Sequence, residues 1–146
     1  FVTKGRVRAP AYRRTSALME QQTEKFQCKL IVWERAVEMC VAVYTLTRAF
    51  PREEIYGLTS QMRRASVSIA SNIAEGYGRT SKEQYRHFLG IAQGSYLELQ
   101  TQLVIANRLS LTSDAASRNA KGLALEVGKM LAAMIRKLSA GEPSRR

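Results

Sequence analysis

The segment Leu58–Gly78 constrains the fold more than any other part of the chain, because it combines one apolar stripe with many small residues. Its stripe recurs at spacings of four, three, four and four and consists of Leu58, Met62, Ala65, Ile69 and Ile73. This spacing places the stripe on one face of a helix. Serines and alanines lie between these positions and let a neighbouring helix approach closely. Gly76 follows the last apolar residue, which predicts that it ends the helix in the left-handed conformation.

Three further helices are predicted from apolar stripes at helical spacing, over about residues 23–49, 80–109 and 113–140. Pro51 ends the first of them, because proline disfavours helical geometry in the residue before it. The third opens with a capping box, formed either by Thr80 with Glu83 or by Ser81 with Gln84. Gly141 is predicted to stop the last helix. Four amphipathic helices with short connections predict an all-α fold, an antiparallel up-down four-helix bundle over residues 23–140.

The first predicted helix carries two apolar seams. One seam consists of Leu30, Trp33, Val37, Cys40 and Tyr44. The other lies about 130° around the helix and consists of Val32, Met39, Val43, Leu46 and Phe50. A helix on the outside of a monomeric bundle is apolar over roughly a third of its circumference, so the second seam needs a partner, either within the bundle or in another subunit. We predict that this second seam forms the subunit interface of a homo-oligomer.

The charge of the chain favours a polyanionic partner. The formal net charge is +11. Residues 1–18 carry a cluster of bases and no acid: Lys4, Arg6, Arg8, Arg13 and Arg14. Residues 1–22 are predicted to be a disordered basic tail, and residues 141–146 a frayed one. The favoured interpretation of the first segment is residues ahead of a native start at Met19; a transit peptide and a nucleic-acid-binding arm are the alternatives.

Basic residues of the second and third predicted helices are the candidate nucleic-acid contacts. They are Arg63, Arg64, Arg79, Lys82 and Arg86. We predict that they pool into one patch at an end of the bundle, since phosphate binding needs charge and reach but no particular motif. The alternative is a solvated face on which Glu83 pairs locally with Arg79 or Lys82. The sequence shows no evident aromatic stacking platform, which argues against a dedicated single-strand binder.

Two further polar residues, Asn72 and Glu75, lie three apart beside Gly76 and therefore on one helical face. One interpretation is a recognition site at the end of the bundle. The favoured one is structural, in which the two side chains bond to loop backbone or to a neighbouring helix. Glu75 lies near the negative end of its helix, so it is expected to have a basic or N–H partner.

No residues suited to catalysis or to metal binding come together in the sequence. His87 is the single histidine, so neither a Cys/His zinc site nor a pair of Glu-x-x-His motifs for two metals is available. Cys28 and Cys40 are predicted to be reduced thiols of a cytoplasmic protein. No apolar run approaches the ~18–20 residues of a membrane-spanning helix. We therefore predict a protein that is not an enzyme, needs no cofactor and binds no membrane.

Two motifs carry a resemblance to a known family. They are Phe50-Pro51-x-Glu53-x-x-Tyr56-Gly57-Leu58-Thr59-x-Gln61-x-Arg63-Arg64-Ala65-x-x-Ser68-Ile69-x-x-Asn72-Ile73-x-Glu75-Gly76 and Phe88-Leu89-x-x-Ala92-x-Gly94-Ser95-x-x-Glu98-Leu99. With Trp33, they resemble the four-helix-bundle proteins often encoded in intervening sequences of bacterial large-subunit ribosomal RNA genes, a family that also includes the accessory variability determinant proteins of diversity-generating retroelements. The resemblance covers about Phe26 to Leu138. It implies a non-enzymatic bundle that forms homo-oligomers, pentamers in particular, and works near nucleic acid.

These observations predict an oligomeric, non-catalytic bundle that binds RNA, DNA or a ribonucleoprotein partner. The alternative is an assembly or scaffolding module whose charge serves solubility.

Overall fold

The computed structural model describes Glu20 and residues 30–140. The chain divides into two compact units, Phe1–Leu30 and Ile31–Arg146, and the description below concerns the second. Both predicted tails, apart from Glu20, lie outside the described residues, as do Cys28, Gly141 and the first turns of the first predicted helix.

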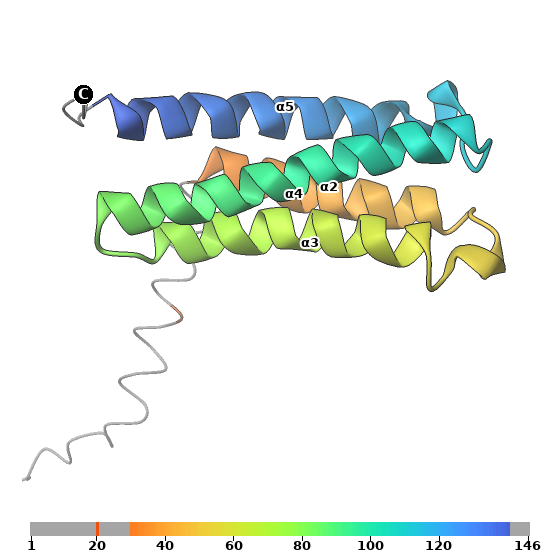
Figure 1. The fold of residues 1–146 in the computed structure, drawn as a ribbon, viewed down its shortest axis with the longest axis horizontal. Helices are drawn as coiled ribbons and strands as arrows, with labels where there is room; N and C mark the ends of the chain where they lie inside the picture. Colours follow the sequence, from red (N-terminus) through yellow and green to blue (C-terminus); the bar gives the residue numbers. More distant parts are fainter. Residues whose placement is uncertain (1–19, 21–29, 141–146) are drawn as a thin grey trace, which may run out of the picture. The chain divides into compact units, whose positions relative to one another are not determined.

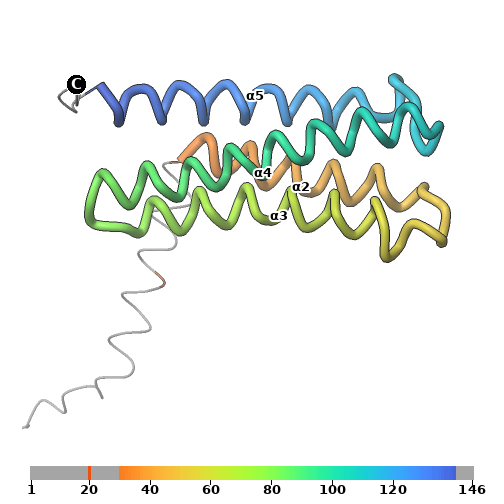
Figure 2. The backbone as a smooth tube through the Cα atoms, in the orientation of Figure 1, coloured from red at the N-terminus to blue at the C-terminus, as the bar shows by residue number. Residues whose placement is uncertain are grey.

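The second unit consists of four long helices, α2 (Ile31–Thr47), α3 (Leu58–Tyr77), α4 (Lys82–Arg108) and α5 (Asp114–Ser139). A short 3-10 helix, η1 (Arg52–Glu54), lies in the connection between α2 and α3. Consecutive helices run in opposite directions and pack side by side (Figure 1). The tube in Figure 2 shows the tight turn between α3 and α4 at one end and the other two connections at the opposite end. The prediction of an all-α four-helix bundle is confirmed for this unit.

The helices occupy the four corners of the bundle. α2 packs against α3 and α5, and α4 packs against the same two helices, so that α2 and α4 lie at opposite corners. Large side chains with almost no exposed surface fill the space between them: Met39, Met62, Ile69, Ile73, Leu89, Leu99, Leu103 and Leu131. The stripe predicted for Leu58–Gly78 is buried throughout, which confirms that this face of α3 points into the core.

Serine hydroxyls cap the beginnings of the last two helices. The Oγ of Ser81 accepts a hydrogen bond from the Gln84 N–H at 3.1 Å, which decides between the two predicted capping boxes for α4. Ser113 caps α5 in the same way, through the Ala116 N–H. Each cap satisfies one of the amides that a helix leaves without an internal acceptor.

Gly76 corrects one prediction. It lies inside α3 rather than after it, and no described glycine has a positive φ, so it does not end the helix in the left-handed conformation. A Cβ atom at this position would lie 3.0 Å from the Cβ of Phe88 and 3.1 Å from the ring of Tyr85, both in α4. The absence of a side chain at Gly76 therefore permits a close approach between α3 and α4.

The seam of α2 that was predicted to form a subunit interface lies inside the bundle. The seam made of Val32, Met39, Val43, Leu46 and Phe50 is buried within the single chain, and Met39 and Val43 are 0 % exposed. These residues belong to the core, and a subunit interface does not lie there. The other seam is partly open, with Val37 and Tyr44 exposed and Trp33 and Cys40 half-buried. Neighbouring helices of the same chain already supply the partner that the second seam requires.

Candidate nucleic-acid interface

The five predicted phosphate contacts do not form one patch. Arg63 and Arg64 lie in the first third of α3, whereas Arg79, Lys82 and Arg86 lie at the turn between α3 and α4. About 15 residues of helix separate the two groups, which corresponds to roughly 22 Å at 1.5 Å per residue. The prediction that they pool at one end of the bundle is wrong, because α3 runs along the full bundle between them (Figure 1).

The group at the α3–α4 turn is partly neutralised. Arg79 forms an ion pair with Glu75 across 2.6 Å and lies over the ring of Phe88, with its guanidinium carbon 4.7 Å from the ring centroid. Glu75 thus has the basic partner expected for an acid near the negative end of a helix. Lys82 is exposed, and Arg86 has an interaction partner of its own. This turn offers a solvated, charge-balanced surface more than a concentrated anion site.

The group at the other end belongs to a pocket. A pocket of about 550 Å³ lies where α2, η1 and the beginning of α3 meet. Four arginines line it: Arg48, Arg52, Arg63 and Arg64. We call it the arginine pocket. Its remaining wall is partly apolar and includes Tyr44, Phe50, Pro51 and Ile55, while Thr47, Thr59 and Ser60 contribute polar groups.

Arg63 is held in a defined orientation inside this pocket. Its Nε donates a hydrogen bond to the Oγ1 of Thr47 at 2.9 Å, and its guanidinium carbon lies 4.7 Å from the centre of the Tyr44 ring. These contacts use one edge and one face of the guanidinium group. The two terminal nitrogens remain for a planar, two-pronged acceptor such as a phosphate or carboxylate.

Thr59 lines the same pocket and carries an unsatisfied hydroxyl that lies beneath the accessible surface. The residue is 5 % exposed, and its Oγ1 has no hydrogen-bond partner. The Leu58 N–H is bonded to the Glu54 carboxylate and the Gln61 N–H to the Gly57 carbonyl, so the amides of Thr59 and Ser60 are left without a protein acceptor among the described residues. Buried polar groups nearly always have a partner, so the unpaired hydroxyl of Thr59 calls for an explanation.

No carboxylate lines the arginine pocket. Of the two acids in η1, Glu54 directs its Oε2 to the Leu58 N–H at 3.0 Å, where it caps α3. None of the four arginines forms an ion pair with a described residue, whereas Arg35 is paired with Glu38 and Glu126 on another face. The pocket therefore concentrates positive charge that the described chain does not neutralise.

Arg48, Arg52 and Thr59 are the residues that sequence analysis missed. Arg48 and Arg52 flank the Pro51 break, and the antiparallel return of α3 brings Arg63 level with Thr47. The signal in the sequence was a hairpin of helices with bases on both sides of its break. Tyr56 was missed as well: it is 96 % exposed and follows Ile55 of the pocket wall, so an aromatic ring is available at this end after all.

Asn72 bonds within its own helix, and not to the loop backbone or the neighbouring helix expected for it. Its Nδ2 donates to the carbonyl and the hydroxyl of Ser68, and Ser68 shares a hydrogen bond of 2.9 Å with Ser95 of α4. Asn72 and Glu75 therefore take part in different interactions.

Nearby, Glu98 and Gln102 line a polar groove of about 540 Å³ that also reaches Arg64.

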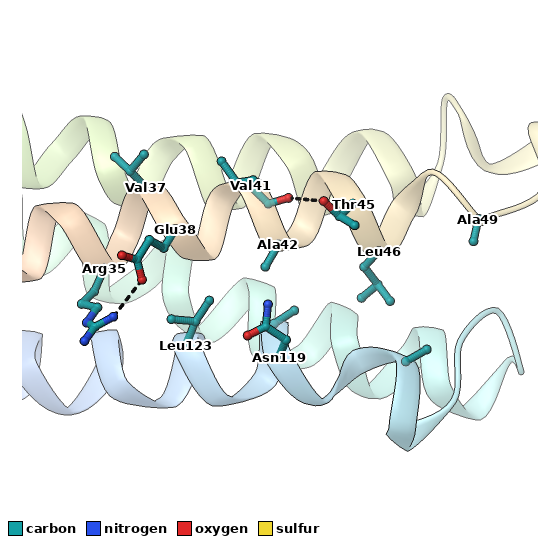
Figure 3. Close-up of a pocket in the computed structure, with 12 residues that line it drawn as sticks. Arg35, Val37, Glu38, Val41, Ala42, Thr45, Leu46, Ala49, Asn119 and Leu123 are labelled. Carbon is teal, nitrogen blue, oxygen red and sulfur yellow. Dashed lines mark hydrogen bonds and ion pairs between the residues drawn. The ribbon is translucent and has the colours of Figure 1, made fainter.

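A second kind of surface lies between α2 and α5. An apolar groove of about 740 Å³ runs along these helices, with Val37, Val41, Leu46 and Leu123 among its lining residues. Figure 3 shows Ala42, Leu46 and Leu123 directed into the space between the two helices, whereas Val37 and Val41 lie along the opposite edge of α2. Arg35 and Glu38 lie toward one end of the groove. Val41 is 61 % exposed, so the groove presents apolar surface to solvent.

The outer face of α4 is also apolar. It exposes Ile91, Leu97, Val104 and Ile105, and Leu97 is 60 % exposed. Gly90 and Gly94 lie among them, and a Cβ atom on either would have nothing within 4 Å. Glycine inside a helix costs about 1 kcal/mol relative to alanine. Packing within the chain does not explain why Gly90 and Gly94 are glycines, because a larger side chain would fit at both positions. Between His87 and Arg108 the helix carries one charged residue, Glu98.

The described residues form neither a metal-binding cluster nor a membrane-spanning helix. In the part of the chain that the structure describes, no three His, Cys, Asp or Glu side chains gather closely enough to hold a metal ion. Among the described helices, none has the length and apolarity needed to cross a membrane.

Comparison with known proteins places the chain in a family. Residues 28–133 match the family model described as 23S rRNA-intervening sequence protein. The chain belongs to this family. The match spans all of α2, α3 and α4 and most of α5, so it covers both the arginine pocket and the two apolar surfaces. The family description names no reaction.

A solved structure shares this fold. It is a protein with unknown function from the S23 ribosomal protein family of Bacteroides thetaiotaomicron. The TM-score is 0.66 at 20 % sequence identity, and the match covers 73 % of this chain and 99 % of that one. No curated protein matches the chain.

Proposed function

We propose that this protein is a non-catalytic, homo-oligomeric helical bundle that binds nucleic acid through phosphate contacts. The observation that carries the proposal is the arginine pocket, in which four arginines meet without a lining carboxylate. Positive charge of this kind is the usual means by which proteins hold a nucleic-acid backbone without reading its sequence. The description of the family refers to 23S rRNA and that of the relative to a ribosomal protein family, which favours RNA.

The two apolar surfaces support assembly into a ring. The apolar groove lies between α2 and α5, and the other apolar surface is the outer face of α4, the helix opposite α2. Each exposes large side chains with few charges. A contact between different surfaces of identical subunits is heterologous, and it closes into a ring when the rotation permits. In the proposed assembly, Leu97 and its neighbours enter the groove beside Val41 of the next copy. The family resemblance favours five copies.

A ring would repeat the arginine pocket around its circumference. Weak contacts on separate subunits then combine through effective concentration, so a long RNA binds more tightly than a short one. The binding is insensitive to sequence and weakens steeply with salt, because each neutralised phosphate releases counterions.

Nucleic-acid binding is tested by fluorescence anisotropy of the full chain with a structured RNA and with duplex DNA over a salt series. The matched control replaces Lys4, Arg6, Arg8, Arg13 and Arg14 with glutamine, because these bases alone can produce a signal. We expect the control protein to retain binding. If it binds neither nucleic acid at low salt, the nucleic-acid function is abandoned and the scaffolding function takes its place.

The ring is tested by light scattering on a size-exclusion column. Val41→Glu places a negative charge in the apolar groove, and Leu97→Glu places one on the outer face of α4. Each variant alone is therefore expected to lose the oligomer. When the two variants are mixed, the intact α4 face of Val41→Glu can still bind the intact groove of Leu97→Glu, so a one-to-one dimer should form. An interface formed by the same surface on both subunits would not give this dimer. Leu125→Glu, at an exposed leucine outside both surfaces, is the matched control and should keep the oligomer.

A further inference from the structure

The arginine pocket combines three features that each suit one chemical group. It holds an arginine oriented by its own contacts, a buried hydroxyl without a partner, and two amides at a helix beginning that lack protein acceptors. Each of these groups is a hydrogen-bond donor of the kind from which a phosphate oxygen accepts. Acidic side chains, which would compete for the same donors, are absent from the lining.

We infer that the arginine pocket is a specific binding site for a single phosphate group, with Arg63 as its central ligand and Thr59 as its second. This inference rests on the proposed function and deepens it, because it selects one phosphate-holding site from all the basic side chains of the surface. The phosphate is either a diester of a nucleic-acid backbone or a free phosphate or nucleotide. Both share the oxygen atoms that the pocket recognises, and the experiment below separates them.

Arg63 is suited to the central position because its orientation is fixed before a ligand arrives. Thr47 donates its own hydroxyl proton to the Val43 carbonyl at 2.9 Å and uses its oxygen to accept from Arg63. The Tyr44 ring supports the guanidinium plane from one side. An arginine restrained in this way loses little conformational freedom on binding, which favours a two-pronged contact with phosphate.

Thr59 distinguishes a binding site from a merely basic surface. A hydroxyl buried without a partner is destabilising in the free protein, so its replacement by the isosteric valine should not weaken folding. In the complex, rotation of the Thr59 side chain turns the same hydroxyl toward a phosphate oxygen, to which it donates. A role in binding and a role in stability therefore predict opposite results for Thr59→Val.

The pocket volume of about 550 Å³ is larger than one phosphate needs and lies within the ~300–1,000 Å³ of small-molecule sites. The apolar wall formed by Phe50, Pro51 and Ile55 leaves room for the sugar attached to a phosphodiester. Arg48, Arg52 and Arg64 then supply additional charge to the adjacent phosphates of a strand.

The experiment uses the full chain as wild type and as Arg63→Gln, Thr59→Val and the control Arg136→Gln, which removes an exposed charge from the last turn of α5. Anisotropy with a labelled RNA measures backbone binding. Thermal unfolding with increasing inorganic phosphate, at constant ionic strength, measures binding of the free anion, since a ligand of the folded state raises the unfolding temperature.

We expect Arg63→Gln to weaken RNA binding about tenfold near 0.1 M salt and to lower the slope against the logarithm of salt concentration by about one. Thr59→Val should weaken RNA binding several-fold while its unfolding temperature without ligand stays equal to or above that of wild type. Arg136→Gln should change affinity less than twofold. A rise of unfolding temperature with inorganic phosphate, absent in the first two variants, would show that the site also takes the free anion.

If Arg63→Gln and Thr59→Val bind RNA as Arg136→Gln does and phosphate protects all proteins equally, the phosphate site is refuted while the proposed function stands. If the wild type binds no RNA but phosphate protects it in an Arg63-dependent way, the proposed function fails. The pocket is then a site for a free phosphate or nucleotide.

Discussion

The Nε of Arg63 donates a hydrogen bond to the Oγ1 of Thr47 across 2.9 Å, and this bond joins α3 to α2 beside the arginine pocket. Thr47 is 2 % exposed and belongs to the interior, whereas the remaining nitrogens of Arg63 serve the pocket. A buried hydroxyl thus decides where a positive charge is held at the surface. This relationship links the packing of the α2–α3 hairpin to the function proposed for it.

Thr47→Val removes the acceptor for Arg63 without changing the volume of the side chain or the charge of the protein. We expect RNA binding to weaken several-fold and the free energy of unfolding to fall by about 0.5–1.5 kcal/mol, the usual contribution of a hydrogen bond. Anisotropy and urea unfolding measure the two effects. Thr45→Val is the matched control: Thr45 is exposed, its hydroxyl bonds within α2, and its loss should leave RNA binding unchanged.

Tyr56→Ala removes the exposed ring next to the pocket wall. Stacking on an aromatic side chain contributes about 1–3 kcal/mol per base in single strands, so we expect affinity for a single-stranded RNA to fall by about tenfold or more. Duplex DNA, whose bases are already stacked, should bind as before. Tyr56→Phe keeps the ring and is expected to preserve both affinities. Equal losses for single and double strands would contradict a stacking role.

Gly76→Ala and Gly122→Ala change the same residue type in opposite surroundings. A methyl group at Gly76 meets the Cβ of Phe88 and the backbone of Tyr85, so α3 and α4 must separate, and we expect the free energy of unfolding to fall by about 1–3 kcal/mol. Nothing lies within 4 Å of a Cβ at Gly122. There alanine should stabilise α5 by up to about 1 kcal/mol. Urea unfolding measures both changes, and equal shifts would refute the close approach at Gly76.

Asp114 makes stability depend on acidity. Hydrogen bonds from Lys121 and then Asn107, together with the charge of Lys121, hold the pKa of its carboxyl below the ordinary value. Because the folded pKa is lower than the unfolded one, the ionised carboxylate stabilises the fold above the unfolded pKa of about 3.9, and this stability is lost as pH falls through the folded pKa. We expect Asp114→Asn to reduce the difference in unfolding temperature between pH 6 and pH 3. An unchanged difference would show that other carboxylates account for the acid sensitivity.

The helical bundle could be predicted from the sequence because its signals are local. The stripe from Leu58 to Ile73, the Pro51 break and the caps at Ser81 and Ser113 each depend on residues within a few turns of one another. Helix periodicity and capping are properties of such short segments. Short connections then leave an antiparallel return as the simplest way to bury four stripes.

The tertiary structure alone decided which surfaces are free. Both seams of α2 are apolar, and only the placement of α3 and α5 shows that Met39 and Val43 lie inside while Val37 and Val41 lie outside. The grouping of Arg48 with Arg63 depends on the register of the α2–α3 hairpin, and the role of Gly76 depends on the path of α4. Periodicity identifies the faces of one helix, but the identity of each neighbour is set by contacts between residues far apart in the chain, which no local pattern contains.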